Sequence, residues 1–117
     1  MIRRQNEINK EQKPAPFGGQ GEILVRNLLE GPEEMYKRGR VFAHTTVFPG
    51  SAIGYHVHNN ESETYYILKG TGIYNDNGTK VELHPGDVFF CGAGEGHGIE
   101  AGQETIEMIA LILYKNN

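Results

Sequence analysis

The sequence predicts an all-β domain built as a closed or nearly closed barrel of antiparallel strands. Over residues 40–107, short apolar runs alternate with breaks made of Gly, Pro, Asn and Asp, which is typical of antiparallel strands joined by tight turns. No segment has the roughly 10 residues of apolar 3.6-residue periodicity that predict a helix. The 117 residues suffice for one core, so any second barrel must come from another chain.

The composition supports this fold class and excludes some partners. The chain has 16 Gly, 5 Pro and no Trp, with 38% hydrophobic residues, as expected of a turn-rich β protein. Its formal net charge of -4 argues against nucleic acid, because phosphate binding needs a basic face.

The compartment is predicted from the single cysteine and the N-terminus. One cysteine, Cys91, excludes an internal disulfide and suits a reducing environment. The polar first 17 residues have no apolar run that would act as a signal or a membrane span. We expect a cytoplasmic protein without membrane contact.

The N-terminal third is expected to have two parts. Residues 1–21 are rich in Gln, Asn, Lys, Pro and Gly and predict a flexible arm with little independent structure. Residues 22–117 are predicted to form a single barrel domain. Residues 22–29 are too apolar for a free tail and predict a strand on a sheet edge, of this chain or of a neighbouring copy. Residues 31–34, with Pro and two acids, favour one helical turn.

The barrel strands are predicted from the apolar runs between the breaks. Two turns are especially clear. Asn77-Gly78 tolerates the positive φ angles of a type I′ hairpin turn, and Pro85-Gly86 suits a type II turn. The expected strands are 41–48, 53–58, 63–69, 72–74, 80–83, 88–91, 98–101 and 105–114.

The last strand is apolar on both faces over residues 109–113. Both apolar faces of such a strand must be buried, and a second subunit is one means of burying the outer face. We therefore predict a homodimer.

Four side chains are candidate metal ligands. His56 and His58 are two residues apart, which on a strand places both imidazoles on one face. Residues 59–62 are turn-prone, so the chain is expected to reverse there and present Glu63 to the same point. His97 would arrive from a distant strand.

This ligand set predicts the class of metal. Three imidazoles and one carboxylate suit one Mn, Fe, Co, Ni or Zn ion per chain, whereas Ca and Mg prefer oxygen ligands. A six-coordinate ion would keep two neighbouring positions for water, dioxygen or a chelating substrate. The site is therefore predicted to be reactive.

The candidate ligands lie in two motifs that together resemble those of the cupin family, over residues 42–115. The second motif departs from the family pattern at Gly92, usually Pro, and Ala101, usually Asn. The resemblance implies a jelly-roll β-barrel, also called a double-stranded β-helix, with a metal in its interior. The matching positions are Gly50, His56, His58, Glu63 and Gly70 in the first motif, and Gly86, Gly94 and His97 in the second.

Two further residues are candidates for catalysis. Tyr65 follows Glu63 by two positions and shares its inward face, so its phenol could donate a hydrogen bond or a proton near the ion; a plain wall residue is the alternative. His44 precedes the first motif and could face the barrel interior; the alternative is a solvent-facing or core-edge histidine. Cys91 is expected to pack in the core, and His84 to be exposed.

These observations leave two classes of function. The first is a small metal-dependent enzyme acting on a sugar, a sugar acid or a hydroxy or keto acid bound directly to the metal, with isomerase, lyase, decarboxylase or, with Fe, dioxygenase chemistry. The second is a non-catalytic module that binds or senses a small molecule. In both, the positive site favours an anionic, chelating ligand. A titratable group beside the open metal positions would favour the enzyme.

Overall fold

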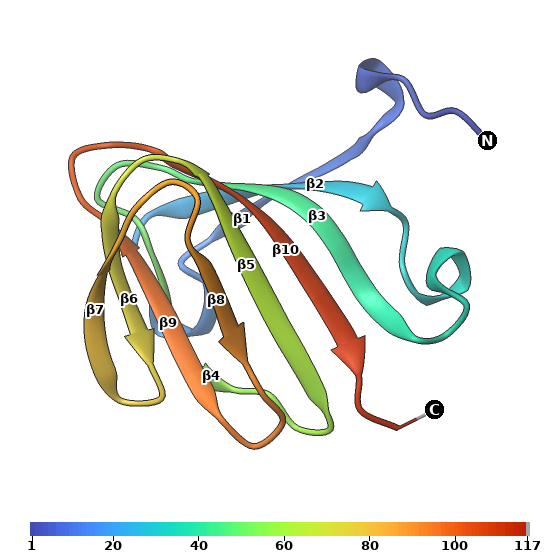
Figure 1. The fold of residues 1–117 in the computed structure, drawn as a ribbon. Helices are drawn as coiled ribbons and strands as arrows, with labels where there is room; N and C mark the ends of the chain where they lie inside the picture. The colour runs from blue at the N-terminus through green and yellow to red at the C-terminus, as the bar shows by residue number, and fades with distance from the viewer. Residues whose placement is uncertain (117) are drawn as a thin grey trace.

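The computed structural model describes residues 1–116, and these form two antiparallel sheets that pack face to face (Figure 1). One sheet has six strands in the order β1-β2-β3-β10-β5-β8, and the other has four in the order β4-β9-β6-β7. The all-β jelly-roll prediction is confirmed. The strands are β1 (Asn9–Pro14), β2 (Glu22–Leu29), β3 (Gly39–Val47), β4 (Ala52–Val57), β5 (Glu61–Lys69), β6 (Gly72–Asp76), β7 (Thr79–Leu83), β8 (Val88–Cys91), β9 (Gly96–Ala101) and β10 (Ile106–Tyr114).

The core lies between the two sheets. Alternate residues of each strand point inward, so the largest buried apolar side chains come from both layers. This packing leaves the other face of each strand toward solvent. The most deeply buried apolar residues include Val47, Ile67, Tyr74, Leu83, Ile99, Ile106 and Met108.

The turns that close the strands follow the expected chemistry. Asn77 and Gly78 have φ angles of 50° and 102°, as a type I′ turn requires at both central positions. Gly86 has a φ of 91°, which suits the third position of a type II turn. A 3-10 turn, η3 (Pro32–Met35), occupies the predicted helical connection.

Two strand ends differ from the predicted ones and change how the ligands are held. β4 ends at Val57, so His58 lies in the turn before β5 and not on a strand. β9 begins at Gly96 and not at the predicted residue 98, so His97 lies within this strand. His97 is paired directly with His56 of β4, so the two imidazoles lie side by side on adjacent strands.

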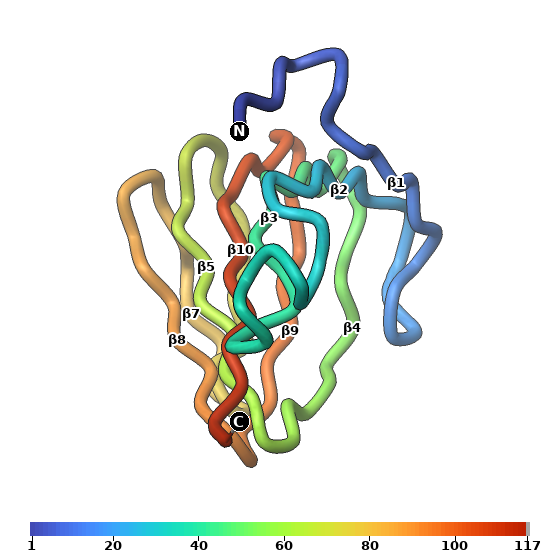
Figure 2. The backbone as a smooth tube through the Cα atoms, turned by 90° about the vertical axis from the view of Figure 1, so that its right-hand side faces the viewer, coloured from blue at the N-terminus to red at the C-terminus, as the bar shows by residue number. Residues whose placement is uncertain are grey.

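The N-terminal residues, expected to have little independent structure, form strand β1 in register with β2. All six β1 side chains are exposed, so the strand is held mainly by its backbone pairing with β2. The polar composition of this segment gives no sign of such pairing. The residues before β1 are held by an ion pair in which the Arg3 guanidinium donates to both carboxylate oxygens of Glu34, at 2.8 and 3.0 Å. The bend after β1 includes the turn η2 (Pro16–Gly18) and lies beside β4 (Figure 2).

The outer face of the six-stranded sheet is partly apolar. On β10 the inner side chains are buried, whereas Leu113 on the outer face is 41% exposed. β5 and β8 add Tyr66, Val88 and Phe90 to this outer face, because Tyr66 pairs with Val88 and Thr64 with Phe90. Among residues 1–116 no helix has the length and apolar character needed to cross a membrane.

Candidate metal centre

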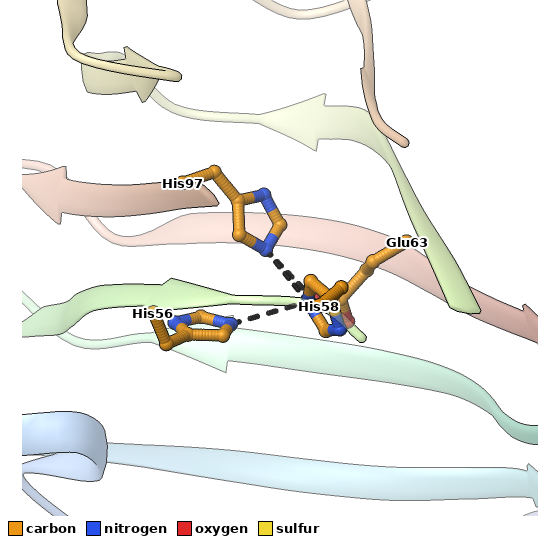
Figure 3. Close-up of side chains that lie close together, drawn as sticks. All are labelled: His56, His58, Glu63 and His97. Carbon is orange, nitrogen blue, oxygen red and sulfur yellow. Dashed lines mark hydrogen bonds and ion pairs between the residues drawn. The ribbon is translucent and has the colours of Figure 1, made fainter. Parts of the chain in front are cut away.

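The structure brings the four predicted ligands together between the two sheets (Figure 3). His56 comes from β4, His97 from β9 and Glu63 from β5, while His58 projects from the turn between β4 and β5. One potential ligand atom from each residue lies within 4.8 Å of all the others. Both sheets therefore contribute to one cluster.

The cluster is buried and has the spacing of a metal shell. Glu63 Oε1 lies 3.0 Å from Nε2 of His58 and 3.0 Å from Nε2 of His97, and these two nitrogens are 3.1 Å apart. Neighbouring corners of an octahedron with metal–ligand bonds of about 2.1 Å are about 3.0 Å apart. His97 has no exposed surface, and Glu63 is 7% exposed. The residues therefore fit a divalent transition metal.

Each imidazole is oriented by a hydrogen bond at its other ring nitrogen. His56 Nδ1 donates to the carbonyl oxygen of Gly54 at 2.8 Å, and His97 Nδ1 lies 2.9 Å from the hydroxyl oxygen of Tyr74. His58 Nδ1 donates to Glu61 Oε2 at 2.6 Å. A proton on Nδ1 leaves Nε2 unprotonated, which is the state that binds a metal. His56 and His58 are thus preset as ligands through Nε2, and the Tyr74 hydroxyl can accept the Nδ1 proton of His97 in the same way.

Glu61 is itself fixed by a paired cation. Arg40 Nε and Nη2 each lie 2.8 Å from a different carboxylate oxygen of Glu61, the bidentate geometry of a strong ion pair. Arg40 lowers the pKa of Glu61 and keeps it ionised as the acceptor for His58. Sequence analysis did not identify Tyr74, Glu61 or Arg40 as site residues.

The electrostatics of the cluster favour its metal-binding charge state. Burial raises the pKa of Glu63, but the hydrogen-bonded imidazoles outweigh burial and hold this pKa well below its usual range. Burial lowers the pKa of His97 and keeps it neutral. The hydrogen bond to Glu63 raises the pKa of His58, so protonation of His58 opposes metal binding as pH falls.

Tyr65 faces the site, as its spacing from Glu63 indicated. The side chain is 2% exposed and its ring stacks on that of His97, with centroids 5.0 Å apart. Burial and the nearby carboxylate of Glu63 raise its pKa well above the usual value. Tyr65 is therefore a neutral phenol that supports a ligand by packing.

His44 does not face the interior and is a core-edge histidine, which is the alternative that the sequence left open. Its Nε2 lies 2.8 Å from Glu107 Oε1, and Thr46 donates to the same oxygen at 2.6 Å. His44 and Thr46 of β3 and Glu107 of β10 thus share the outer face of the sheet, whereas the adjacent Thr45 lines the interior. The period-two alternation explains this placement, because Ala43, Thr45 and Val47 occupy the buried positions.

Three of the four ligands, His56, His58 and Glu63, line a small cavity of about 150 Å³. Its wall is mostly apolar, but the N-terminal segment also reaches it. Phe17 stacks on His56, with ring centroids 4.0 Å apart and planes 13° from parallel. The lining residues are Lys13, Pro16, Phe17, Ile23, Val25, Arg40, Val41, Thr45, Ile53, His56, His58, Glu63, Tyr65, Met108, Ala110 and Ile112.

Two glycines let the N-terminal segment approach this closely. A side chain at Gly54 would clash with the backbone carbonyl of Phe17, and one at Gly19 would clash with that of Ala52. Reciprocal backbone hydrogen bonds of 2.8 and 3.1 Å between Gln20 and Ala52 hold the segment there. The arm is thus a wall of the site, which its composition did not indicate.

Comparison with protein families assigns the fold and its motifs. The model of the cupin domain, Cupin_2, matches residues 43–114. The chain belongs to the cupin family. In this cupin the matched range contains all four candidate ligands, whereas Lys13 and Phe17 lie outside it.

One curated relative and one solved structure are strongly similar to this cupin. A Thermotoga maritima protein named oxalate-binding protein is 41% identical over 114 residues, covering 97% of this chain and 93% of the relative. A crystal structure described as a predicted oxalate decarboxylase from Thermotoga maritima matches with a TM-score of 0.91 and 41% identity, over 97% of this chain and 99% of that one.

A more distant structure shares only the fold. The polyketide cyclase RemF from Streptomyces resistomycificus matches with a TM-score of 0.73 and 20% identity, over 99% of this chain and 81% of that one. The same barrel therefore occurs in proteins with a different named activity, and the site must decide the function of this cupin.

Proposed function

We propose that this cupin binds one divalent transition metal through His56, His58, Glu63 and His97 and, on that metal, a small chelating dicarboxylate such as oxalate. The observation that carries the proposal is the buried three-histidine, one-glutamate cluster at the wall of a cavity of about 150 Å³. The similarity to a protein named oxalate-binding protein supports the choice of ligand.

The charge of the site supports an anionic ligand. Glu63 is the only carboxylate among the residues that line the cavity within the described part of the chain, so a bound divalent ion keeps a net positive charge. Four protein atoms leave two positions of a six-coordinate ion, and a chelating dicarboxylate can supply two oxygens. The mostly apolar wall strengthens this attraction relative to water.

The size of the cavity favours a very small ligand. Cavities for drug-sized molecules are commonly about 300 to 1,000 Å³, whereas this one is about 150 Å³. A two-carbon dianion fits such a space better than a sugar or a sugar acid does. We therefore prefer oxalate and its close analogues to the larger metabolites.

We favour binding over turnover because, apart from Lys13, the cavity lining offers few groups for proton transfer. Glu63 is committed as a ligand, and Arg40 is committed to Glu61. The raised pKa of Tyr65 makes this phenol a weak acid at neutral pH. A binding or sensing role needs none of these groups to move a proton.

A decarboxylase is the second candidate, supported by the description of the similar Thermotoga structure as a predicted oxalate decarboxylase. Conversion of oxalate to formate and carbon dioxide places a proton on the carbon that loses the carboxylate. Tyr65, whose ring stacks on that of His97, is the phenol that lines the cavity and would be the source of that proton. Formate release would support this alternative, and oxygen consumption with Fe would support a dioxygenase.

The test begins with the metal. We expect elemental analysis to find about one transition metal per chain in the wild type and little in His58→Ala or Glu63→Ala. His84→Ala is the matched control, because this histidine is exposed and outside the cluster. Equal metal content in the wild type and both ligand variants would contradict the ligand assignment.

The ligand is tested next by calorimetry of the manganese-loaded protein with oxalate, and with acetate as a monocarboxylate control. We expect oxalate to bind and acetate to bind much more weakly, without formation of formate. Metal-loaded protein that binds no oxalate would refute the proposed ligand, and formate formation would favour the decarboxylase.

We also propose that the protein is cytoplasmic and forms a homodimer. A cytoplasmic location is supported by the single cysteine, Cys91, which is a buried free thiol. A homodimer is supported by the apolar outer face of the six-stranded sheet.

A further inference from the structure

We propose that Lys13, from the N-terminal strand β1, is a second recognition element of the ligand site and binds the side of the dicarboxylate that does not face the metal. This inference rests on the proposed function and adds to it a residue outside the matched cupin domain. The ligand class is a small dianion whose carboxylates carry more oxygens than the metal can take.

Strand register directs Lys13 toward the site. Lys13 pairs with Ile23 across β1 and β2, and directly paired residues share a face of the sheet. Ile23 is 4% exposed and belongs to the core, so this face is the interior one. Lys13 accordingly lines the same cavity as the metal ligands.

Lys13 is also available to a ligand. No ion pair within 4.0 Å joins it to another residue of the described range 1–116. Arg40, the other cation of the cavity wall, is already engaged with both oxygens of Glu61. Lys13 therefore supplies the uncompensated positive charge at the cavity, opposite in sign to a dicarboxylate.

The segment that follows Lys13 is held in a defined position. Ala15 and Phe17 have φ angles of 35° and 54°, a conformation costly for residues with a side chain and often found at binding sites. The Ala15 N–H donates to the Gly21 carbonyl at 2.7 Å, and the Phe17 ring stacks on His56. Lys13 thus belongs to a fixed wall and not to a free tail.

The chemistry of a chelated dianion completes the inference. A dicarboxylate that gives the metal one oxygen from each carboxylate keeps two oxygens directed away from it. An ammonium group has three donors and forms strong charge-assisted hydrogen bonds with carboxylate oxygens. A hydroxy acid such as glycolate keeps only one such oxygen, so Lys13 should favour oxalate over glycolate.

The test compares oxalate and glycolate affinities of manganese-loaded wild type, Lys13→Met and Lys13→Arg by calorimetry. Lys10→Met is the matched control, because Lys10 pairs with Arg26 and lies on the opposite face of β1. We expect Lys13→Met to weaken oxalate binding by about tenfold or more, to reduce the preference over glycolate, and to leave manganese affinity unchanged. Lys13→Arg should retain most of the oxalate affinity, and Lys10→Met all of it.

The outcomes separate the two proposals. If the wild type binds oxalate and Lys13→Met binds it equally well, Lys13 has no recognition role, while the proposed function stands. If the metal-loaded wild type binds no oxalate, the proposed function fails and the role of Lys13 fails with it. Loss of manganese affinity in Lys13→Met would show that Lys13 acts on the metal site and would overturn its assignment to the ligand.

Discussion

Removing the Tyr74 hydroxyl tests whether hydrogen bonds outside the ligand shell set the metal affinity. In Tyr74→Phe, the ring remains in the core, where Tyr74 is 1% exposed, but the oxygen 2.9 Å from His97 Nδ1 is lost. To free Nε2 for the metal, His97 must carry its proton on Nδ1. In the variant that proton has no partner, and His97 has no exposed surface through which water would replace it.

The magnitude follows from the cost of one buried unpaired N–H group, about 1 to 3 kcal/mol. Loss of a partner behind a metal-bound histidine commonly lowers metal affinity by about 10-fold to 100-fold, which is the same range. We therefore expect the dissociation constant for Zn²⁺ or Mn²⁺ to rise by about one to two orders of magnitude in Tyr74→Phe.

Competition with a chromophoric chelator at fixed pH measures this change. Tyr66→Phe is the matched control, since Tyr66 is 45% exposed on the outer face of the large sheet, and it should bind metal like the wild type. Wild-type affinity in a folded Tyr74→Phe protein would refute the view that this hydroxyl supports His97 as a metal ligand.

Three further outcomes are expected. Gly54→Ala should displace the N-terminal segment and speed amide hydrogen exchange at Gln20 and Ala52, whereas Gly102→Ala, where a methyl meets open space, should not; unchanged exchange in Gly54→Ala would contradict the close docking. Burial raises the pKa of Cys91 to about 11, so this thiol stays protonated at pH 8 and should react with a thiol reagent only after unfolding; rapid reaction of the native protein would contradict its burial. Light scattering coupled to size exclusion should give twice the 13.0 kDa chain mass, and Phe90→Lys on the exposed sheet face should shift the protein to monomer; a monomeric wild type at tens of micromolar would count against the dimer.

The fold and three of the four candidate ligands were predictable because their signals are local, whereas His97 was assigned through its place in the second cupin motif. The His56 and His58 spacing, the turn before Glu63 and the Asn77-Gly78 hairpin each lie within a few residues. The outward direction of His44 could also have been predicted. Ala43 and Val47 are apolar and lie at alternate positions of β3, so the odd-numbered residues face the core and His44 faces away from it.

The partners of the ligands could not be predicted, since they depend on pairing between distant strands. Tyr74 reaches His97 only because β6 lies beside β9 in a register that pairs Asp76 with His97. The N-terminal wall depends on the backbone approach at Gly19 and Gly54, and no side-chain pattern encodes it. Sequence periodicity assigns faces of strands, whereas neighbours across sheets follow from the complete topology.

The division of the ligands between the two sheets has a kinetic consequence. His58 and His97 are 39 residues apart along the chain, and Glu63 belongs to the opposite sheet from His56 and His97. No single hairpin contains the whole cluster, so the metal gains its full set of bonds only after the barrel has closed. Interactions that form after the transition state slow unfolding and leave the folding rate almost unchanged. Bound metal should therefore slow unfolding of the barrel and have little effect on the rate at which it folds.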